Sequence, residues 1–247
     1  MKTCVRDKRS GMTLIEVVIA ITLMALLVTG MTMAMRISLT SLGKANDKLT
    51  LNRRITGAQR ILEQQIAGLM PVAAVTPLGS PGQAGLRIAF FQGESQTMRF
   101  ASTYSLHEAS RGKPHILEFQ VVPGGESGGV RLVVNEIPYT SPFSAGEMVT
   151  GRSTVDGVLL TMFRPVEVGP QSFVLADKLA LCHFLYREAR PQPEYQRWVE
   201  QWVKPDWPMS IRIEMQPLTH EPGQLTMMSI TAPVHVDKKP LELYEDK

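Results

Sequence analysis

The chain has 247 residues, of which 44% are hydrophobic and 20% charged, a composition typical of a folded protein rather than a disordered or fibrous one. Its formal net charge of +3 is carried by the first eleven residues, and the remainder holds 22 basic and 22 acidic residues. A neutral body argues against nucleic acid as a partner, because nucleic-acid binding depends on clustered Lys and Arg.

The first predicted element is an apolar run of 24 residues, Met12 to Met35, behind a short basic head that ends at Gly11. As a helix it would span about 36 Å, enough to cross the ~30 Å hydrocarbon core of a bilayer. A secretory signal has its small-residue cleavage site after the apolar run, whereas Gly11 precedes it. Glu16 lies inside the run, and the high cost of a charged side chain in a membrane interior makes it a functional candidate.

The residues Gly11-Met12-Thr13-Leu14-Ile15-Glu16 resemble the processing site of type IV prepilins and of type II secretion pseudopilins. The resemblance implies that a prepilin peptidase cleaves between Gly11 and Met12 and methylates the new amino group of Met12. The family usually has phenylalanine at the position of Met12. The resemblance also implies an assembly role for Glu16, near the N-terminal ammonium of a neighbouring subunit, so that two charges that are costly alone in lipid offset each other.

The helical pattern continues beyond the apolar run, and we expect one helix over residues 12–70 that ends at Pro71. Its second half is amphipathic, with apolar residues at Ile55, Ala58, Ile61, Leu62, Ile66 and Leu69. With the resemblance, the predicted organisation is a cleaved basic leader (1–11), a transmembrane segment (12–35), an amphipathic periplasmic helix (36–70) and a globular, β-rich periplasmic domain (71–247).

From Pro71 onward the pattern changes to short β-like runs separated by Gly and Pro clusters. Gly124-Gly125, Gly128-Gly129 and Asp156-Gly157 predict turns. The expected strands are Leu86–Phe91, Thr97–Thr103, His115–Val122, Arg131–Glu136, Val158–Phe163, Lys178–Tyr186, Met209–Gln216 and Leu225–Thr231. The prediction is an α+β fold of the pilin-like class, in which a long N-terminal transmembrane and spine helix packs on a mostly antiparallel domain of two β-sheets.

A second resemblance covers residues 178–236. An aromatic strand, a tryptophan-bearing loop and a proline-led strand follow one another as Phe184 and Tyr186, then Trp198, Trp202 and Trp207-Pro208, then Ile211–Met215. This order resembles the C-terminal half of J-type minor pseudopilins of type II secretion, although the loop from Arg187 to Arg197 is longer than usual. For the tryptophans, packing against the sheet is favoured, and contact with a partner is the alternative.

The sequence contains no zinc, nucleophile-elbow or phosphate-loop motif, and its five histidines are widely spaced. The glycine-rich residues 123–130 favour a hairpin loop. Glu118, Glu136 and Glu214 occupy strand patterns in which alternate residues face solvent, so no acid–base pair is expected. We therefore expect no catalytic residue, no metal and no cofactor.

Cys182 would be the one cysteine left after cleavage at Gly11, which excludes a disulfide within the mature chain. Because adjacent strand residues point to opposite faces, we expect Cys182 to be a small buried residue beside an exposed His183 rather than half of a metal site.

The resemblances imply a non-catalytic subunit of the bacterial inner membrane, with one membrane pass and a periplasmic C-terminal domain. It would be a J-type minor pseudopilin at the tip of a type II secretion fibre that helps to initiate fibre assembly and protein export. The implied partners are the prepilin peptidase, other minor and major pseudopilins and secreted cargo. Helices would pack closely at Ala20, Ala25 and Gly30.

Two alternatives remain open. One is a minor pilin of a type IV pilus or a DNA-uptake fibre. The other is an uncleaved, signal-anchored periplasmic enzyme or binding protein, in which replacing Glu16 by Leu would have no effect.

Overall fold

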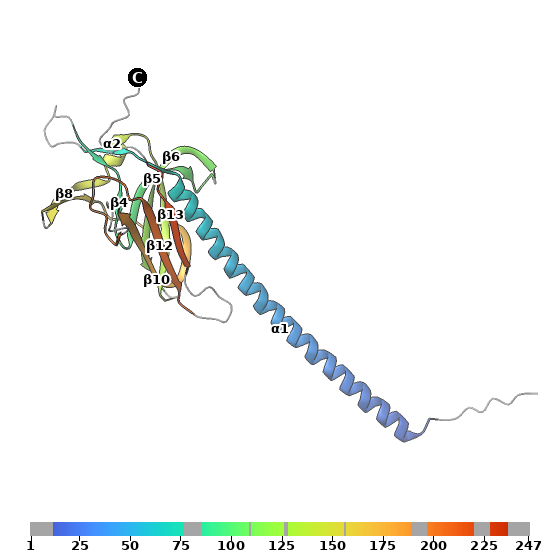
Figure 1. Cartoon of the computed structure of the whole chain (residues 1–247). Coiled ribbons are helices and arrows are strands. Elements are labelled where there is room, and N and C mark those ends of the chain that lie inside the picture. Colours follow the sequence, from blue (N-terminus) through green and yellow to red (C-terminus); the bar gives the residue numbers. More distant parts are fainter. Residues whose placement is uncertain are drawn as a thin grey trace, which may run out of the picture. The chain divides into compact units, whose positions relative to one another are not determined.

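The computed structural model describes residues 12–76, 85–108, 110–125, 128–155, 157–188, 197–219 and 228–236. The chain divides into two compact units, Met1–Leu51 and Asn52–Lys247. The helix α1 spans Leu14–Ala67 (Figure 1). Its residues up to Leu51, together with Met12 and Thr13, make up the described part of the first unit. Its last turns, from Asn52, belong to the second unit.

Gly68 ends α1. Its backbone N–H donates to the Gln64 carbonyl oxygen (2.9 Å), and its own carbonyl oxygen accepts from the Thr103 backbone N–H (2.8 Å). A Cβ at this position would lie only 2.7 Å from the Ser102 Oγ, so glycine permits the close approach of the helix end to the sheet. The next two residues form a strand, β1 (Leu69–Met70), and α1 therefore ends three residues before the predicted Met70.

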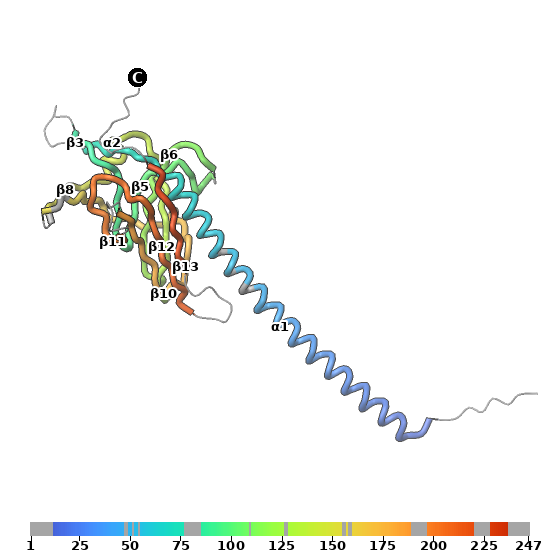
Figure 2. The backbone as a smooth tube through the Cα atoms, in the orientation of Figure 1, coloured from blue at the N-terminus to red at the C-terminus, as the bar shows by residue number. Residues whose placement is uncertain are grey.

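One antiparallel sheet of nine strands dominates the second unit, in the order β1-β5-β6-β7-β10-β12-β13, with β4 beside β5 and β11 beside β10 (Figures 1 and 2). The bounds are β4 (Gln92–Gly93), β5 (Thr97–Ser105), β6 (Ser110–Pro123), β7 (Val130–Pro138), β10 (Phe173–Glu188), β11 (Arg197–Val199), β12 (Ser210–Pro217) and β13 (Met228–Pro233). Two separate ribbons pair β2 (Ala73–Thr76) with β3 (Leu86–Ala89), and β8 (Val149–Val155) with β9 (Val158–Phe163).

The predicted α+β class, a long apolar N-terminal helix followed by antiparallel sheet, is confirmed. The expected division into two sheets is wrong in detail, because β10 joins both halves into one. The first part of β10 pairs with β7 and the second with β12, and the register shifts on either side of Leu179. Lys178, next to this point, has a left-handed backbone (φ 56°), as expected of a bulge that redirects a strand.

The larger core lies between the amphipathic end of α1 and one face of the nine-stranded sheet. Leu62 and Ile66, one helical turn apart, are fully buried against the aromatic side chains of Phe100, Phe119 and Phe184. Phe100 and Phe119 stack with ring centroids 5.7 Å apart. The helical spacing of apolar residues in this segment therefore correctly predicts the packing face of the helix.

A second, smaller core covers the opposite face of the central strands. It is built from the β2–β3 ribbon, the start of β8, and the short helix α2 (Pro142–Gly146), which is capped by the Ser141 side chain. Ala101 and Ile116 point into this core from β5 and β6 and are fully buried. The central strands are thus buried on both faces, which the sequence analysis did not predict.

Each of the eight expected strands overlaps an observed strand, although residues 225–227 of the last one lie outside the described part. The glycine-rich residues 123–130 connect β6 to β7 as a hairpin, and Gly125, Gly128 and Gly129 all have φ between 61° and 70°. Five strands, β1, β2, β4, β8 and β11, were not predicted, nor was α2. The proline-containing loop between Arg187 and Arg197 lies outside the described residues from 189 to 196.

Candidate functional site

The candidate processing and assembly residues lie at the start of α1. Met12 and Thr13 precede the helix, and Gly11 lies outside the described residues. The Thr13 carbonyl oxygen accepts hydrogen bonds from the backbone N–H groups of Glu16 (3.0 Å) and Val17 (3.3 Å), so the helix begins directly after Thr13. Glu16 lies in the first turn, where the helix dipole favours a negative charge.

The hydroxyl groups farther along the apolar run are satisfied inside the helix. Thr22, Thr29 and Thr32 each donate to a backbone carbonyl oxygen three or four residues earlier, over 2.7–2.9 Å. These bonds remove most of the cost of placing a hydroxyl in hydrocarbon. The carboxylate of Glu16 has no hydrogen bond or ion pair to any described residue, so it is the charged group in this run that a partner outside the chain would have to balance.

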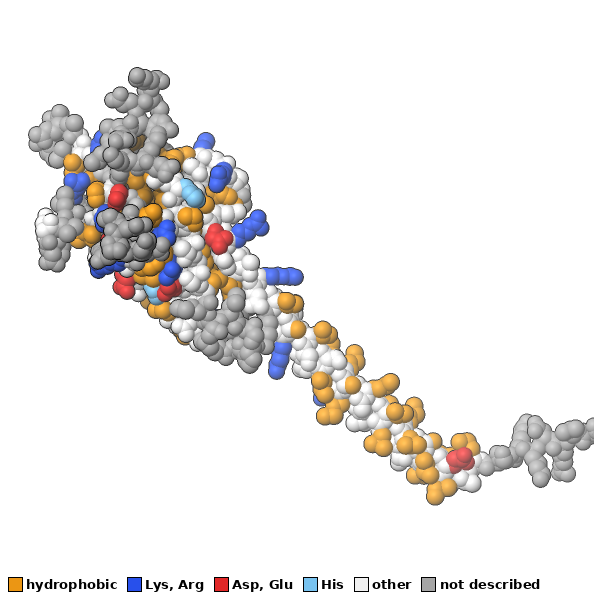
Figure 3. Space-filling model, in the orientation of Figure 1, with side chains coloured by type: hydrophobic (Ala, Val, Ile, Leu, Met, Phe, Trp, Pro, Cys, Tyr) orange, Lys and Arg blue, Asp and Glu red, His pale blue; other side chains and the backbone are white. Residues whose placement is uncertain are grey.

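No described residue covers the apolar half of α1. Every described side chain from Met12 to Asn46 is exposed, including large ones such as Leu14 (83%) and Met31 (74%). Hydrophobic side chains extend along this part of the helix in Figure 3. One helix in the described part of the chain, over Leu14–Asn46, is long and apolar enough to cross a membrane, with a mean hydropathy of 2.4.

The comparison with protein families matches residues 6–32 to the prokaryotic N-terminal methylation motif. The match contains the predicted processing residues and most of the apolar run. It supports a type IV pilin-like protein. A search of curated proteins gives no match to the chain.

The motif implies processing by a prepilin peptidase and assembly with other pilins. It also suggests a structural fibre subunit rather than an enzyme. The apolar helix is consistent with a single-pass membrane anchor.

The tryptophan-bearing segment packs against the sheet of its own chain. Trp202 is only 8% exposed and belongs to the larger core. Its backbone N–H donates to the Gly93 carbonyl oxygen (2.8 Å), and its indole Nε1–H donates to the Asp206 carbonyl oxygen (2.7 Å). Trp207 is partly buried against the same core. These contacts agree with the favoured interpretation of local packing.

The aromatic strand is arranged as predicted, with Phe184 and Tyr186 on one face of β10 and both fully buried. The Tyr186 hydroxyl donates to the Glu94 carbonyl oxygen (3.0 Å), and burial raises the pKa of the Tyr186 phenol well above its ordinary value. On the more exposed side, the Arg212 guanidinium stacks 4.0 Å from the ring centroid of Trp198.

Two carboxylates that were expected to face solvent are buried instead. Glu118 is 3% exposed, and the Glu136 side chain is 5% exposed. Glu136 accepts hydrogen bonds from the backbone N–H groups of Leu106 (2.8 Å) and His107 (3.0 Å), which hold the β5–β6 turn. The prediction failed because it assumed that one face of the central strands is open to water.

A row of polar residues crosses the second face of the sheet and was missed by the sequence analysis. Arg99 and Glu118 lie opposite each other on β5 and β6, and Glu118 lies opposite Asn135 on β7. The Arg99 guanidinium is fully buried and lies 2.8 Å from a Glu118 carboxylate oxygen, while the Asn135 side-chain amide donates to the other oxygen (3.2 Å). Each of the three successive strands β5, β6 and β7 has one charged or amide residue near its centre. This pattern in the sequence could have predicted the row.

The polar row also fixes the segment that follows β9. The Arg99 Nη2 donates to the Arg164 carbonyl oxygen (3.1 Å), and the Asn135 Nδ2 donates to the Glu167 carbonyl oxygen (2.9 Å). Burial lowers the pKa of Arg99, and the nearby Glu118 carboxylate acts in the opposite direction. All of these groups have partners within the chain, so the arrangement supports a structural role rather than acid–base chemistry.

Cys182 is buried at 2% exposure, as predicted, and burial raises the pKa of its thiol to about 12. His183 points to the other face and its Nε2 lies 3.1 Å from a carboxylate oxygen of Glu214. Within the described ranges, no three His, Cys, Asp or Glu side chains lie together in a way that could hold a metal ion.

Proposed function

We propose that the protein is a J-type minor pseudopilin of a type II secretion system. It would be cleaved between Gly11 and Met12, methylated on Met12, held in the bacterial inner membrane by residues 12–35, and assembled with other pseudopilins. Its β-rich domain would lie in the periplasm, at the tip of the fibre, where it helps to initiate assembly and export. Residues 1–11 would be the leader, residues 36–70 the amphipathic helix, and residues 71–247 the globular domain.

The observation that carries the assembly role is the unpartnered Glu16 inside an uncovered apolar helix. A lone carboxylate in hydrocarbon is costly, and the ammonium of a neighbouring Met12, created by cleavage, has the charge needed to offset it. The helix also offers small residues at Ala20, Ala25 and Gly30 for close packing, and a Cβ at Gly30 would meet nothing in this chain.

The J-type assignment is supported by the order of elements in the C-terminal half. Strand β10 carries Phe184 and Tyr186, the segment after it carries the tryptophans, and β12 begins two residues after Pro208. This order supports the proposed subtype, and the alternative is a minor pilin of another fibre.

The first test is the intact mass of the N-terminus after coexpression with a prepilin peptidase. The proposal predicts that wild type loses residues 1–11 and gains one methyl group on Met12, and that Gly11→Ala retains the leader. Expression of the wild-type chain without the peptidase provides the control. An intact leader in both chains would contradict the proposal and favour a signal-anchored periplasmic protein.

The second test separates the two kinds of fibre. A strain that lacks its J-type minor pseudopilin but keeps the rest of a type II secretion system is complemented with this chain, and secreted enzyme activity in the medium is measured. Restored secretion supports the J-type assignment. Processing and fibre incorporation in a type IV pilus strain, without restored secretion, would contradict the assignment while leaving the pilin-like role intact.

A further inference from the structure

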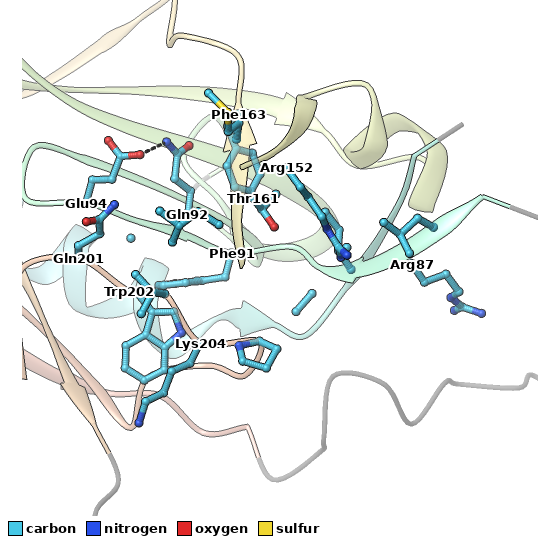
Figure 4. A pocket seen from close by; sticks show the side chains of 18 residues that line it. Arg87, Phe91, Gln92, Glu94, Arg152, Thr161, Phe163, Gln201, Trp202 and Lys204 are labelled. Carbon is cyan, nitrogen blue, oxygen red and sulfur yellow. Dashed lines mark hydrogen bonds between the residues drawn. The ribbon is translucent and has the colours of Figure 1, made fainter. Parts of the chain in front are cut away.

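A groove of about 720 Å³ opens on the surface of the second unit, bounded by β3 and β4, by β9, and by the loop of residues 201–205 (Figure 4). The groove lies entirely within residues 86–205, and an inference about it does not depend on the proposed function.

The groove is lined by apolar side chains that water reaches. Phe91 and Trp202 form buried parts of the lining, each 8% exposed. Around them, Leu86 (37% exposed), Met162 (51%) and Val203 (36%) are large hydrophobic residues open to solvent. Three such side chains gathered in one concave site indicate a binding surface, because isolated ones are ordinary on a protein surface.

The walls of the groove are fixed by contacts within the body. The Phe163 ring of β9 packs edge-on against Phe90 at 5.8 Å and beneath the Arg99 guanidinium at 5.3 Å. On the opposite side, Trp202 is held by its two hydrogen bonds, and the Phe91 ring packs edge-on against Tyr186 at 5.8 Å. A preformed groove binds a ligand without a large ordering cost.

Two strands that line the groove have an edge without a partner among the described residues. Strand β3 pairs with β2 alone, and β9 pairs with β8 alone. A free strand edge presents unpaired backbone N–H and C=O groups, which an extended polypeptide can bind by adding a strand. The groove therefore suits an extended segment better than a compact small molecule.

The charged side chains of the lining are mostly positive. Arg87 and Arg152 are exposed and form no ion pair with any described residue. The Nζ of Lys204, a third basic residue of the lining, lies 3.7 Å from a carboxylate oxygen of Glu188, which does not line the groove. The one carboxylate in the lining, Glu94, accepts a hydrogen bond from the Gln92 side chain (2.8 Å), drawn as a dashed line in Figure 4. This balance favours an acidic ligand.

We propose that the groove binds an extended, acidic segment of another polypeptide. The backbone of the segment pairs with one of the free strand edges. Because side chains alternate along a strand, apolar residues enter the groove between Phe91 and Met162 while carboxylates on the other face meet Arg87 and Arg152.

The test uses the full chain in nanodiscs of zwitterionic lipid and two fluorescent octapeptides, one alternating leucine with glutamate and the other alternating leucine with lysine. Fluorescence anisotropy measures binding, with empty nanodiscs as the blank. We expect the acidic peptide to bind at least tenfold more tightly than the basic one, since several charges act together. An acidic peptide that is N-methylated at alternate residues should lose binding, because it cannot donate the strand hydrogen bonds.

Variants locate the site. The double variant Arg87→Glu/Arg152→Glu should reverse the preference, and Met162→Asp should weaken binding of the acidic peptide. The matched control is Arg111→Glu/Lys113→Glu, which changes two exposed basic residues of β6 outside the groove and should leave binding unchanged. Urea unfolding of each variant verifies that the body is folded.

Three results would overturn the proposal: equal binding of the two peptides, no binding of either peptide, or acidic-peptide binding that neither groove variant reduces. Two others would assign the groove a different occupant and also overturn it. One is a dimer of the wild-type chain, seen by light scattering, that Met162→Asp dissociates. The other is flotation with anionic vesicles that the Arg87→Glu/Arg152→Glu variant abolishes while no peptide binds.

Discussion

The helix α1 contributes to two regions in which apolar side chains have opposite environments. In the apolar half, Leu27 is 69% exposed, whereas in the amphipathic end Leu62 is fully buried in the core. Charges differ in the same manner. Glu16 has no partner among the described residues, while Glu118 is bound to Arg99 and Asn135.

The difference shows which region is stabilised by contacts within its own chain. The body satisfies its buried polar groups largely by its own contacts, so changes there should alter its stability. Side chains in the apolar half are exposed among the described residues, so changes there should alter its contacts with lipid and with neighbouring helices.

The largest effect is expected from breaking the buried ion pair of the body. Arg99→Met leaves Glu118 buried without its counter-charge and should lower the free energy of unfolding by about 3–5 kcal/mol. Urea unfolding of the full chain in detergent, followed by tryptophan fluorescence, measures this, because all three tryptophans lie in the second unit. The double variant Arg99→Met/Glu118→Leu should regain much of the loss. A single variant as stable as wild type would contradict the structural role of the row.

The next effect compares two leucines of α1. Leu62→Ala should lower the free energy of unfolding of the body by about 2–5 kcal/mol, because it leaves a cavity in the core. Leu27→Ala removes the same atoms from an exposed position and should change that free energy by less than about 0.5 kcal/mol. The same fluorescence measurement serves both. Equal losses would show that the apolar half depends on contacts within the chain.

A smaller effect is expected at two glycines. Gly68→Ala places a Cβ against the Ser102 hydroxyl and should destabilise the body by about 1–3 kcal/mol. Gly30→Ala meets nothing in the chain, so the unfolding of the body should not change. Its expected effect is on helix association, which native mass spectrometry of the detergent-solubilised subunits can measure. A destabilised body in Gly30→Ala would contradict the separation of the two regions.

The smallest effect concerns the Cys182 thiol. Because burial raises its pKa to about 12 in the folded chain, the unfolded chain releases this proton at lower pH than the folded one. The thiol therefore contributes stability that is fully present below about pH 8 and is lost as the pH rises towards the folded pKa. Between pH 8 and 10 we expect wild type to lose about 1.5 kcal/mol more than Cys182→Ala. Identical pH profiles of the two chains would contradict a buried, protonated thiol.

Much of the fold was predictable because its local patterns agree with its packing. The helical spacing of Ala58, Leu62 and Ile66 gave the buried face of α1, and alternating apolar residues gave the eight main strands. Periodicity carries this information because burial on one face repeats every 3.6 or every 2 residues.

The missed features depend on contacts that are distant in sequence. The third layer, made of the β2–β3 ribbon, α2 and β8–β9, covers a sheet face that alternation alone would leave open. Glu118 was expected to face solvent, but it is buried because this layer covers it. Likewise β10 joins two groups of strands through the bulge near Lys178, and no local pattern shows which strands pair across it.

The candidate processing site depends less on tertiary structure than the body does. Gly11, Met12 and Glu16 lie in one short segment at the start of a long apolar run, so the chemistry of processing can be proposed without tertiary structure. The groove beside β9 was not predictable, since Phe91, Met162 and Trp202 come from three separate segments.

We expect Glu16 to serve contacts between subunits and not the folding or processing of its own chain. The most direct test measures two quantities for wild type and Glu16→Leu, in cells that express a prepilin peptidase and a complete set of type II pseudopilins. These are the intact mass of the N-terminus and the fraction of the chain recovered in crosslinked pseudopilin complexes. The account predicts that Glu16→Leu is cleaved and methylated like wild type but is lost from the complexes. Recovery of Glu16→Leu in complexes at the wild-type level would contradict it.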